Sequence, residues 1–204
     1  MHYDKELIAH KLCRWEQFLQ GYRLPDWDDI PDFGLYMDQV MVLLANYLDF
    51  VPTSMEKMVT TSTINNYVRL KVMPAPVKKK YYRVHIAYLL IILTLKQSLS
   101  ISDVQQIIPP DIPRRDVQTI YTDYAKRLQA VALFFTQEVR SAAQDLLSPE
   151  SENAENATEK LLIQSALVAG FSRILAEKLA HLRDADTQQV LQAEEDKRKL
   201  RETR

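Results

Sequence analysis

Apolar residues recur at intervals of three and four along most of this chain, which is the spacing of one face of an α-helix. The pattern predicts an amphipathic helix over residues 1–19 and a second helix over residues 36–50. Between them, residues 24–34 are rich in proline and aspartate and are expected to form a loop, with Trp27 and Phe33 as packing anchors. The first quarter of the chain is therefore predicted to be two helices joined by an anchored loop.

A short helix and a turn are predicted next. Ser62 has the residue type of an N-cap, and the helix is expected to run from Thr63 to about Lys71. Two prolines then forbid its continuation, so residues 77–82 should form an extended loop or a hairpin strand.

The most apolar segment, residues 84–99, predicts a buried helix. Four of its positions are expected to be inaccessible to solvent: Ile86, Leu89, Leu90 and Leu93. Its apolar run is far shorter than the roughly 20 residues that span a bilayer, so no membrane segment is predicted. Ser100 or Ser102 is expected to cap a further short helix that ends at Ile108.

Two long helices are predicted in the C-terminal half, over residues 116–147 and 158–183, with an acidic, flexible linker over 148–157. One apolar stripe runs along the first of them: Ile120, Tyr124, Leu128, Val131, Phe135, Val139, Ala142 and Leu146. This stripe is expected to bury against the last long helix or against a partner chain. The charged tail, residues 185–204, is expected to be a frayed helix or disordered.

These elements give a mainly α-helical fold in four parts. Residues 1–48 form an N-terminal helical segment, and residues 49–109 form a central domain that ends in a proline-rich boundary. Residues 110–184 form a C-terminal helical region, and the charged tail follows. The low glycine content, 3 residues, also favours helices over a turn-rich sheet fold.

Composition narrows the chemistry. The sole cysteine, Cys13, excludes an internal disulfide and a cysteine zinc site, and it indicates a reducing, cytoplasmic setting. The four histidines do not cluster, so each is expected to be a surface or capping residue. The aspartates of the loop over 24–34 lack the glycine and the closing glutamate of a calcium loop. With no glycine-rich phosphate loop and no nucleophile elbow, we expect no metal, no cofactor and no enzyme activity.

Positive charge is concentrated in one segment. From Lys57 to Ser102 there are eight basic residues and no acidic one, while the chain as a whole holds 26 basic and 27 acidic residues. A near-neutral protein that gathers its cations in one segment is suited to a polyanion, of which nucleic acid is the commonest.

The predicted short helix divides into an apolar and a polar face. Ile64, Tyr67 and Val68 fall on one face and can bury, while Ser62, Asn65, Asn66 and Arg69 fall on the other face. Asparagine suits bidentate hydrogen bonding to adenine, and arginine suits guanine or phosphate. This face can equally be an ordinary solvated surface.

A basic segment follows that helix. Lys78, Lys79 and Lys80 precede Tyr81, Tyr82 and Arg83. Lysines attract phosphates, and tyrosine hydroxyls can bond phosphate oxygens. A recognition helix followed by a basic loop is the plan of a winged helix-turn-helix domain.

Three segments resemble MerR-type regulators. Residues 62–74, STINNYVRLKVMP, are similar to their second helix, in which Ser, a spacer and Thr-Leu/Ile-Arg-Tyr-Tyr-Glu precede a Gly-Leu-Ile-x-Pro turn. Residues 81–92, YYRVHIAYLLII, are similar to their Tyr-Ser-x-x-Asp-Leu-x-x-Leu-x-x-Ile segment. Residues 99–104, LSISDV, are similar to the turn into their next helix. In this chain Asn65 and Asn66 replace the family's Arg-Tyr.

The resemblance implies a winged helix-turn-helix that binds duplex DNA. It implies that Thr63, Tyr67 and Arg69 face DNA, and that Lys79 stands where the family has its wing arginine. Leu70 and Lys71 occupy the place of the family's glycine turn. The full set of candidate DNA-binding residues is Ser62, Thr63, Asn65, Asn66, Tyr67, Arg69, Lys71, Lys78, Lys79, Lys80, Tyr81 and Arg83.

A further resemblance is to the YkrK-like group of bacterial proteins, which carries a domain of unknown function. Its signature, INNYV-K, PxPxKKKY and HLAYLL-LKQ-LS, is similar to residues 64–68, 74–81 and 85–100. This resemblance implies a family and no activity.

The sequence thus leads to the hypothesis of a MerR-like transcriptional regulator that binds double-stranded DNA and pairs as a homodimer. The alternative is an adaptor without DNA binding, whose basic surface meets an acidic protein.

Overall fold

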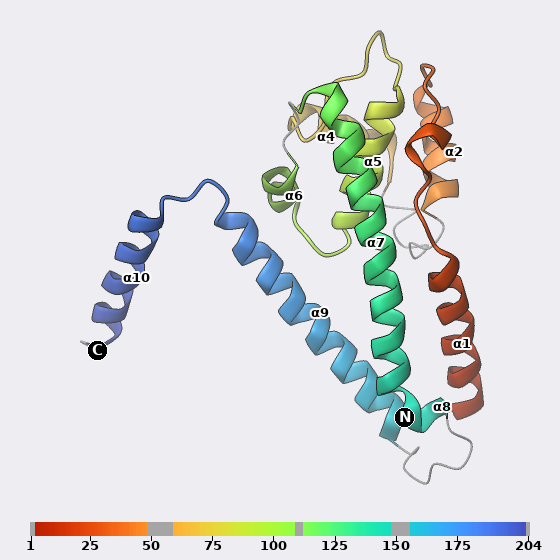
Figure 1. Cartoon of the computed structure of the whole chain (residues 1–204), viewed down its shortest axis with the longest axis vertical. Helices are drawn as coiled ribbons and strands as arrows, with labels where there is room; N and C mark the ends of the chain where they lie inside the picture. The colour runs from red at the N-terminus through yellow and green to blue at the C-terminus, as the bar shows by residue number, and fades with distance from the viewer. Residues whose placement is uncertain (1–2, 49–58, 109–111, 148–155, 203–204) are drawn as a thin grey trace.

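The computed structural model describes residues 3–48, 59–108, 112–147 and 156–202, and these ranges are mainly helical, without a strand (Figure 1). The mainly α-helical prediction is confirmed. The helices are α1 (Lys5–Gly21), α2 (Met37–Tyr47), α4 (Thr61–Arg69), α5 (Arg83–Leu95), α6 (Ile101–Ile107), α7 (Arg114–Ala142), α8 (Gln144–Leu147), α9 (Ala157–His181) and α10 (Thr187–Glu202), with a 3-10 turn η1 at Trp27–Asp29. None of these helices is long and apolar enough to cross a membrane.

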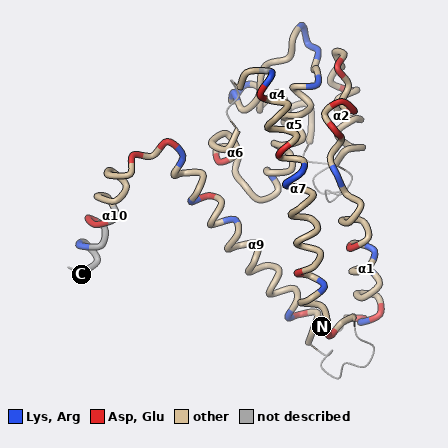
Figure 2. Tube along the Cα trace, viewed as in Figure 1, with Lys and Arg blue, Asp and Glu red and all other residues tan. Residues whose placement is uncertain are grey.

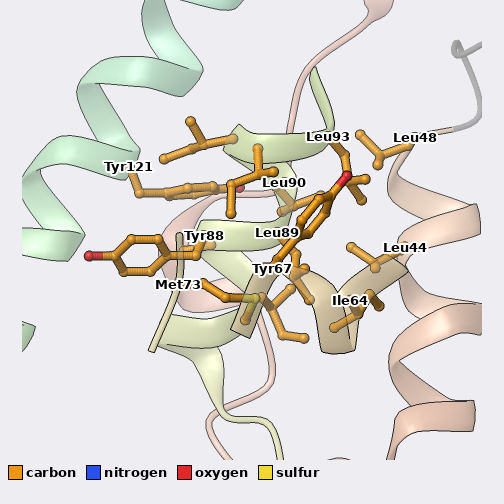
Figure 3. Packing of buried hydrophobic residues seen from close by; sticks show 14 of the residues in the cluster. Leu44, Leu48, Ile64, Tyr67, Met73, Tyr88, Leu89, Leu90, Leu93 and Tyr121 are labelled. Carbon is orange, nitrogen blue, oxygen red and sulfur yellow. The ribbon is translucent and has the colours of Figure 1, made fainter. Parts of the chain in front are cut away.

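Helix α5 is the centre of the core. Every residue from His85 to Thr94 is buried, and α2 and α7 pack against this helix. Figure 3 shows Ile64 and Tyr67 of α4 directed toward the same cluster as Leu89. The predicted burial of this helix is confirmed, although it ends at Leu95, four residues before the predicted end.

One hydrophobic core crosses the expected domain boundaries. It begins at Tyr22, includes the inner residues of α2, α4 and α5, and extends to Tyr121 of α7. The hydroxyl of Tyr121 donates to the carbonyl of Pro25 at 2.8 Å, and its ring lies 6.0 Å from that of Trp27. The segments before residue 49 and after residue 109 therefore help to build the same compact head as α4 and α5.

Helix α7 packs on α5 and α1, rather than on the last long helix. The ring of Phe135 on α7 packs edge to face against the ring of Trp15 on α1, with 5.6 Å between the ring centres. Arg140 of α7 forms an ion pair with Glu16 of α1 at 3.0 Å. The expected stripe is therefore divided, because part of it faces these helices while Ile120 and Val131 remain exposed. The long helix also ends at Ala142 and is followed by the separate turn α8.

Other local predictions need correction or lie outside the described residues. Thr60, rather than Ser62, caps α4, since its hydroxyl accepts from the amide of Thr63 at 3.1 Å. Trp27 packs against the core as expected, but Phe33 is 66% exposed and anchors nothing. The tail forms helix α10, which is one of the two states expected for it. Lys57, the end of the second predicted helix and most of the predicted linker lie outside the described ranges.

Candidate nucleic-acid interface

Helix α4 presents the polar face that the sequence predicted. Ile64 and Tyr67 are buried, while Ser62, Asn65 and Arg69 are exposed on the opposite side. A guanidinium N–H of Arg69 donates to the side-chain oxygen of Asn66 at 2.7 Å. This bond holds the arginine along the helix surface with its remaining donors available.

A lysine makes the turn that ends α4. Lys71 has φ of 55°, and its amide bonds to the carbonyl of Val68 at 3.0 Å, while the amide of Val72 bonds to that of Tyr67 at 2.9 Å. These two bonds define a Schellman motif, in which the residue with positive φ is usually glycine. The sequence has no glycine here, yet the chain makes the same turn.

Helix α6 supports this turn. The side-chain amide of Gln105 reaches the carbonyls of Leu70 and Lys71 at 3.3 and 3.4 Å. Ser100 and Asp103 form the capping box that starts α6, and the hydrogen bond from the Ser100 side chain lowers the pKa of the Asp103 carboxyl. Of the two serines considered, Ser100 is thus the cap.

Residues Val77–Lys80 form a minimal hairpin turn. The amide and carbonyl of Val77 exchange hydrogen bonds with those of Lys80, both at 3.0 Å. The two central residues, Lys78 and Lys79, have φ of 50° and 63°. Positive φ at both central positions is the mark of a type I′ turn, whose favoured sequence is Asn-Gly. The predicted hairpin exists, with lysines at its tip.

Lysines therefore occupy conformations that disfavour them. Among the described residues, the non-glycine positions with positive φ are Lys71, Lys78, Lys79 and Asp184. A side chain in this region costs roughly 1–2 kcal/mol relative to glycine-like freedom. All three lysines are exposed. The chain thus displays three cations on turns whose geometry favours other residues.

The stem of the hairpin is fixed against the loop before α2. Leu35 and Tyr81 exchange backbone hydrogen bonds at 2.8 Å in both directions, and the ammonium of Lys80 lies 5.3 Å from the ring centre of Tyr36. Gly34 permits this approach, because a Cβ at that residue would lie 2.9 Å from the Cβ of Lys80.

We expect Gly34→Ala to loosen the hairpin and to destabilise the head by about 1–3 kcal/mol, the usual cost of forcing an added methyl into a tightly packed position. Thermal or urea unfolding measures the loss. Gly21→Ala is the matched control, because a Cβ there meets nothing within 4 Å, and it should not destabilise the head. Equal effects of the two substitutions would contradict the close approach of Gly34 to Lys80.

His85 is a capping residue. This is one of the two roles, surface or capping, that the sequence predicted for the histidines. Its Nδ1 accepts from the amide of Tyr82 at 3.0 Å, and its Nε2 lies 3.0 Å from the carbonyl of Ala75, to which it donates. It ties the segment before the hairpin to the start of α5. Within the described ranges, no group of three or more His, Cys, Asp or Glu side chains could hold a metal ion.

Three candidate residues are structural. Tyr67 and Tyr81 are 6% and 3% exposed, and burial raises the pKa of each phenol. Arg83 donates to the carbonyl of Ile30 at 2.7 Å and pairs with Asp28 at 3.2 Å. These side chains position the turn and the loop, so they are left out of the candidate surface.

The remaining residues define what we call the basic face: Ser62, Asn65, Asn66, Arg69, Lys71, Lys78 and Lys79. Thr63 and Lys80 are half-buried at its margin, where the hydroxyl of Thr63 lies 3.0 Å from that of Thr60. Figure 2 shows that α4 and the lysine-bearing hairpin lie at the same end of the molecule. The aspartates of the loop over 26–32 lie on the α2 side of this view.

Residues 25–124 match the model of a family described as a domain of unknown function, DUF1836. No curated protein and no solved structure matches the chain. The matched range runs from the loop before η1 into the first third of α7 and therefore contains the whole basic face. It corresponds closely to the head that shares one core.

Proposed function

We propose that the chain is a DNA-binding transcriptional regulator whose head is a MerR-like winged helix-turn-helix. Kinship with the YkrK-like group belongs to the same proposal. The observation that carries it is the set of exposed lysines held at positive φ beside a polar helix. Glycine or asparagine would make these turns more stable, so the lysines are not there for the stability of the fold. Their positive charge is the property that a function would require.

The parts of the basic face suit different parts of a duplex. In this proposal α4 enters the major groove, where Asn65, Asn66 and Arg69 reach base edges. The hairpin acts as the wing, where Lys78 and Lys79 meet phosphates and carry no sequence information. The bond between Asn66 and Arg69 limits the rotamers that binding would otherwise have to order.

Two copies of the chain would present two basic faces to a palindromic site, as dimeric regulators do. Homodimer formation is thus part of the proposal, and double-stranded DNA is the partner. An acidic protein is the alternative partner, because the same charges would attract it.

Replacing Asn66 or Arg69 by alanine should reduce the preference for the best duplex by about 1–3 kcal/mol for each bidentate hydrogen-bonded pair that is removed. Affinity for unrelated duplexes should change little with Asn66→Ala. Fluorescence anisotropy on a duplex selected from a random library measures both quantities. Lys11→Gln with Arg14→Gln is the control, since these exposed cations lie on α1, outside the basic face.

Unchanged binding to the selected duplex, in variants that keep their helical content, would show that α4 is no recognition helix. Competition then separates the two partner classes. Excess unrelated duplex should displace labelled DNA from the basic face, whereas failure of any duplex to bind at low salt would leave the acidic-protein alternative.

A further inference from the structure

The middle of α9 is uncovered on every side. All fourteen residues from Leu162 to Leu175 are exposed, and Arg173 is the only charged one among them. Figure 1 shows this helix leaving the base of α7 as a separate arm. A helix with a single charge in fourteen residues and a continuous apolar side normally buries that side, and an isolated helix of this length is marginal in water.

Both ends of α9 are nevertheless fixed to the body. At its start, Ala157 and Leu161 pack with Ala143 and Leu146 near α8. Near its end, Ala180 is buried and α9 contacts α6. The arm is therefore held in place at both ends, with an apolar span between them that no described part of the chain covers.

The exposed area is also too large for a monomer of this mass. The chain exposes 14436 Å², whereas a compact monomer of 23.7 kDa should expose roughly 9,800 Å². The surplus of roughly 4,600 Å² exceeds the half-share of an obligate dimer interface, which totals about 2,000–5,000 Å² over both chains. A second copy can therefore account for up to about half of it.

One stripe of α9 points away from the body. Ile163, Leu167, Phe171 and Ile174 follow one another at helical spacing and are 49–70% exposed. At 3.6 residues per turn, the middle of this stripe lies about a third of a turn from Leu161 on one side and from Ala180 on the other. A second molecule can reach it without displacing α7 or α8.

The stripe of one α9 is complementary to the same stripe on a second α9 that runs in the opposite direction. Consider two α9 helices that pack antiparallel about a two-fold axis between Val168 and Ala169. A residue of one helix then faces the residue of the other helix for which the two residue numbers add up to 337. Leu167 then faces Gly170, a position where nothing lies within 4 Å of an added Cβ. Large side chains thus meet small ones, which is what close helix packing requires.

The remaining pairs fit the same register. Phe171 faces Ala166, and Ile163 faces Ile174. At the two ends, the acidic and basic residues also oppose each other: Glu159 with Lys178 and Lys160 with Glu177. The same two-fold axis thus pairs apolar residues with apolar ones and opposite charges with each other, as expected for an isologous interface.

We propose that α9 pairs with α9 of a second copy, antiparallel, through the stripe Ile163–Leu167–Phe171–Ile174, and that this pairing is the homodimer interface. The inference extends the proposed pairing of two copies and does not depend on whether the basic face binds DNA. Helix α10 is a poor occupant, because it is rich in charge. A bilayer is a poor one too, since fourteen residues span about 21 Å of helix.

Sedimentation of the full chain tests the pairing. The wild type should sediment at twice 23.7 kDa at micromolar concentration, and Phe171→Asp should shift it to the monomer. Leu179→Asp is the matched control: Leu179 is 60% exposed but lies five whole turns after Leu161, on the side of α9 that packs against the body at the start of the helix, so this variant should remain a dimer. A monomeric wild type, or a dimer that disappears with Leu179→Asp and persists with Phe171→Asp, would overturn the proposal.

Disulfide trapping tests the register. In a Cys13→Ser background, a chain with Leu167→Cys mixed with one carrying Gly170→Cys should give covalent dimers on mild oxidation. A mixture of Leu161→Cys and Ala176→Cys chains, which obey the same sum but pack against the body, should give few. The reverse result would place the interface on the other side of α9.

The two proposals fail separately. Phe171→Asp leaves the basic face intact, so its head should still bind duplex DNA, with the same salt dependence per chain as the wild type. A dimer that binds no DNA would refute the proposed DNA binding alone. A DNA-binding monomer would refute the pairing of two copies and leave the proposed DNA binding in place.

Discussion

Replacing Leu89 by alanine should lower the free energy of unfolding by about 2–5 kcal/mol. Leu89 is 0% exposed and lies in the middle of α5, which packs between α2 and α7. Figure 3 places it among side chains from several elements, including Ile64 and Leu44. The truncation leaves a cavity that helices anchored on several sides cannot collapse to fill, so the missing dispersion attraction adds to the transfer free energy of the removed atoms.

Urea unfolding followed by circular dichroism measures this cost. Val42→Ala is the control, because Val42 is 63% exposed on α2 and its truncation should change stability by less than about 0.5 kcal/mol. A loss below about 1 kcal/mol at Leu89 would contradict the central position of α5. DNA binding should weaken only in conditions where Leu89→Ala is partly unfolded, since this side chain touches no part of the basic face.

Periodicity was sufficient for the elements that carry the fold. The apolar run of α5, the stripe of α7 and the spacing in α9 each predict a helix that the structure contains. The partners of these helices were harder to infer. The stripe of α7 was expected to meet the last long helix or another chain, yet α1 covers part of it, because spacing reports a face and says nothing of what lies against it.

Tyr67 shows two lines of sequence reasoning in conflict. Helical spacing places it beside Ile64 and predicts burial, whereas the resemblance to MerR-type regulators implies contact with DNA. The structure buries it at 6% exposure. The local pattern was the better guide here, since the apolar face of a short helix must meet the core whatever its relatives do at the same position.

Tyr81 and Arg83 could not be assigned from the sequence. They stand in a basic segment and have the residue types of a phosphate-binding loop. Their partners, Leu35, Ile30 and Asp28, come from a loop roughly fifty positions earlier. No local pattern reveals such interactions, because they depend on the packing of the loop before α2 against the start of α5.

The positive φ of the three lysines was not predicted, for a different reason. In sequence, positive φ at helix ends and in tight hairpins is predicted from glycine or asparagine. Lysines occupy these positions here, at Lys71, Lys78 and Lys79. The backbone makes both turns regardless. Local rules that fail in a well-packed head are informative, because strained positions tend to mark function.

Replacing Lys78 by asparagine and Lys79 by glycine should therefore make the protein more stable and a weaker DNA binder. The favoured residues of a type I′ turn relieve the cost of positive φ, for a gain of about 1–2 kcal/mol in the free energy of unfolding. The removal of two cations at the wing should lower the slope of log affinity against log salt by roughly 0.9 for each phosphate that is no longer neutralised. Urea unfolding and anisotropy titrations between low and physiological salt measure the two effects.

The variant Lys78→Gln with Lys79→Gln separates charge from backbone strain. It removes the same cations and keeps a side chain at both positions, so the salt slope should fall as far while the stability gain disappears. Lys11→Gln with Arg14→Gln removes two cations from α1 and should change neither quantity. Because strain and charge reside in the same two residues, a gain in stability without a loss of affinity would show that the lysines are held there for something other than nucleic acid. A loss of affinity in the Asn-Gly variant alone would show instead that the shape of the wing, and not its charge, contacts the duplex.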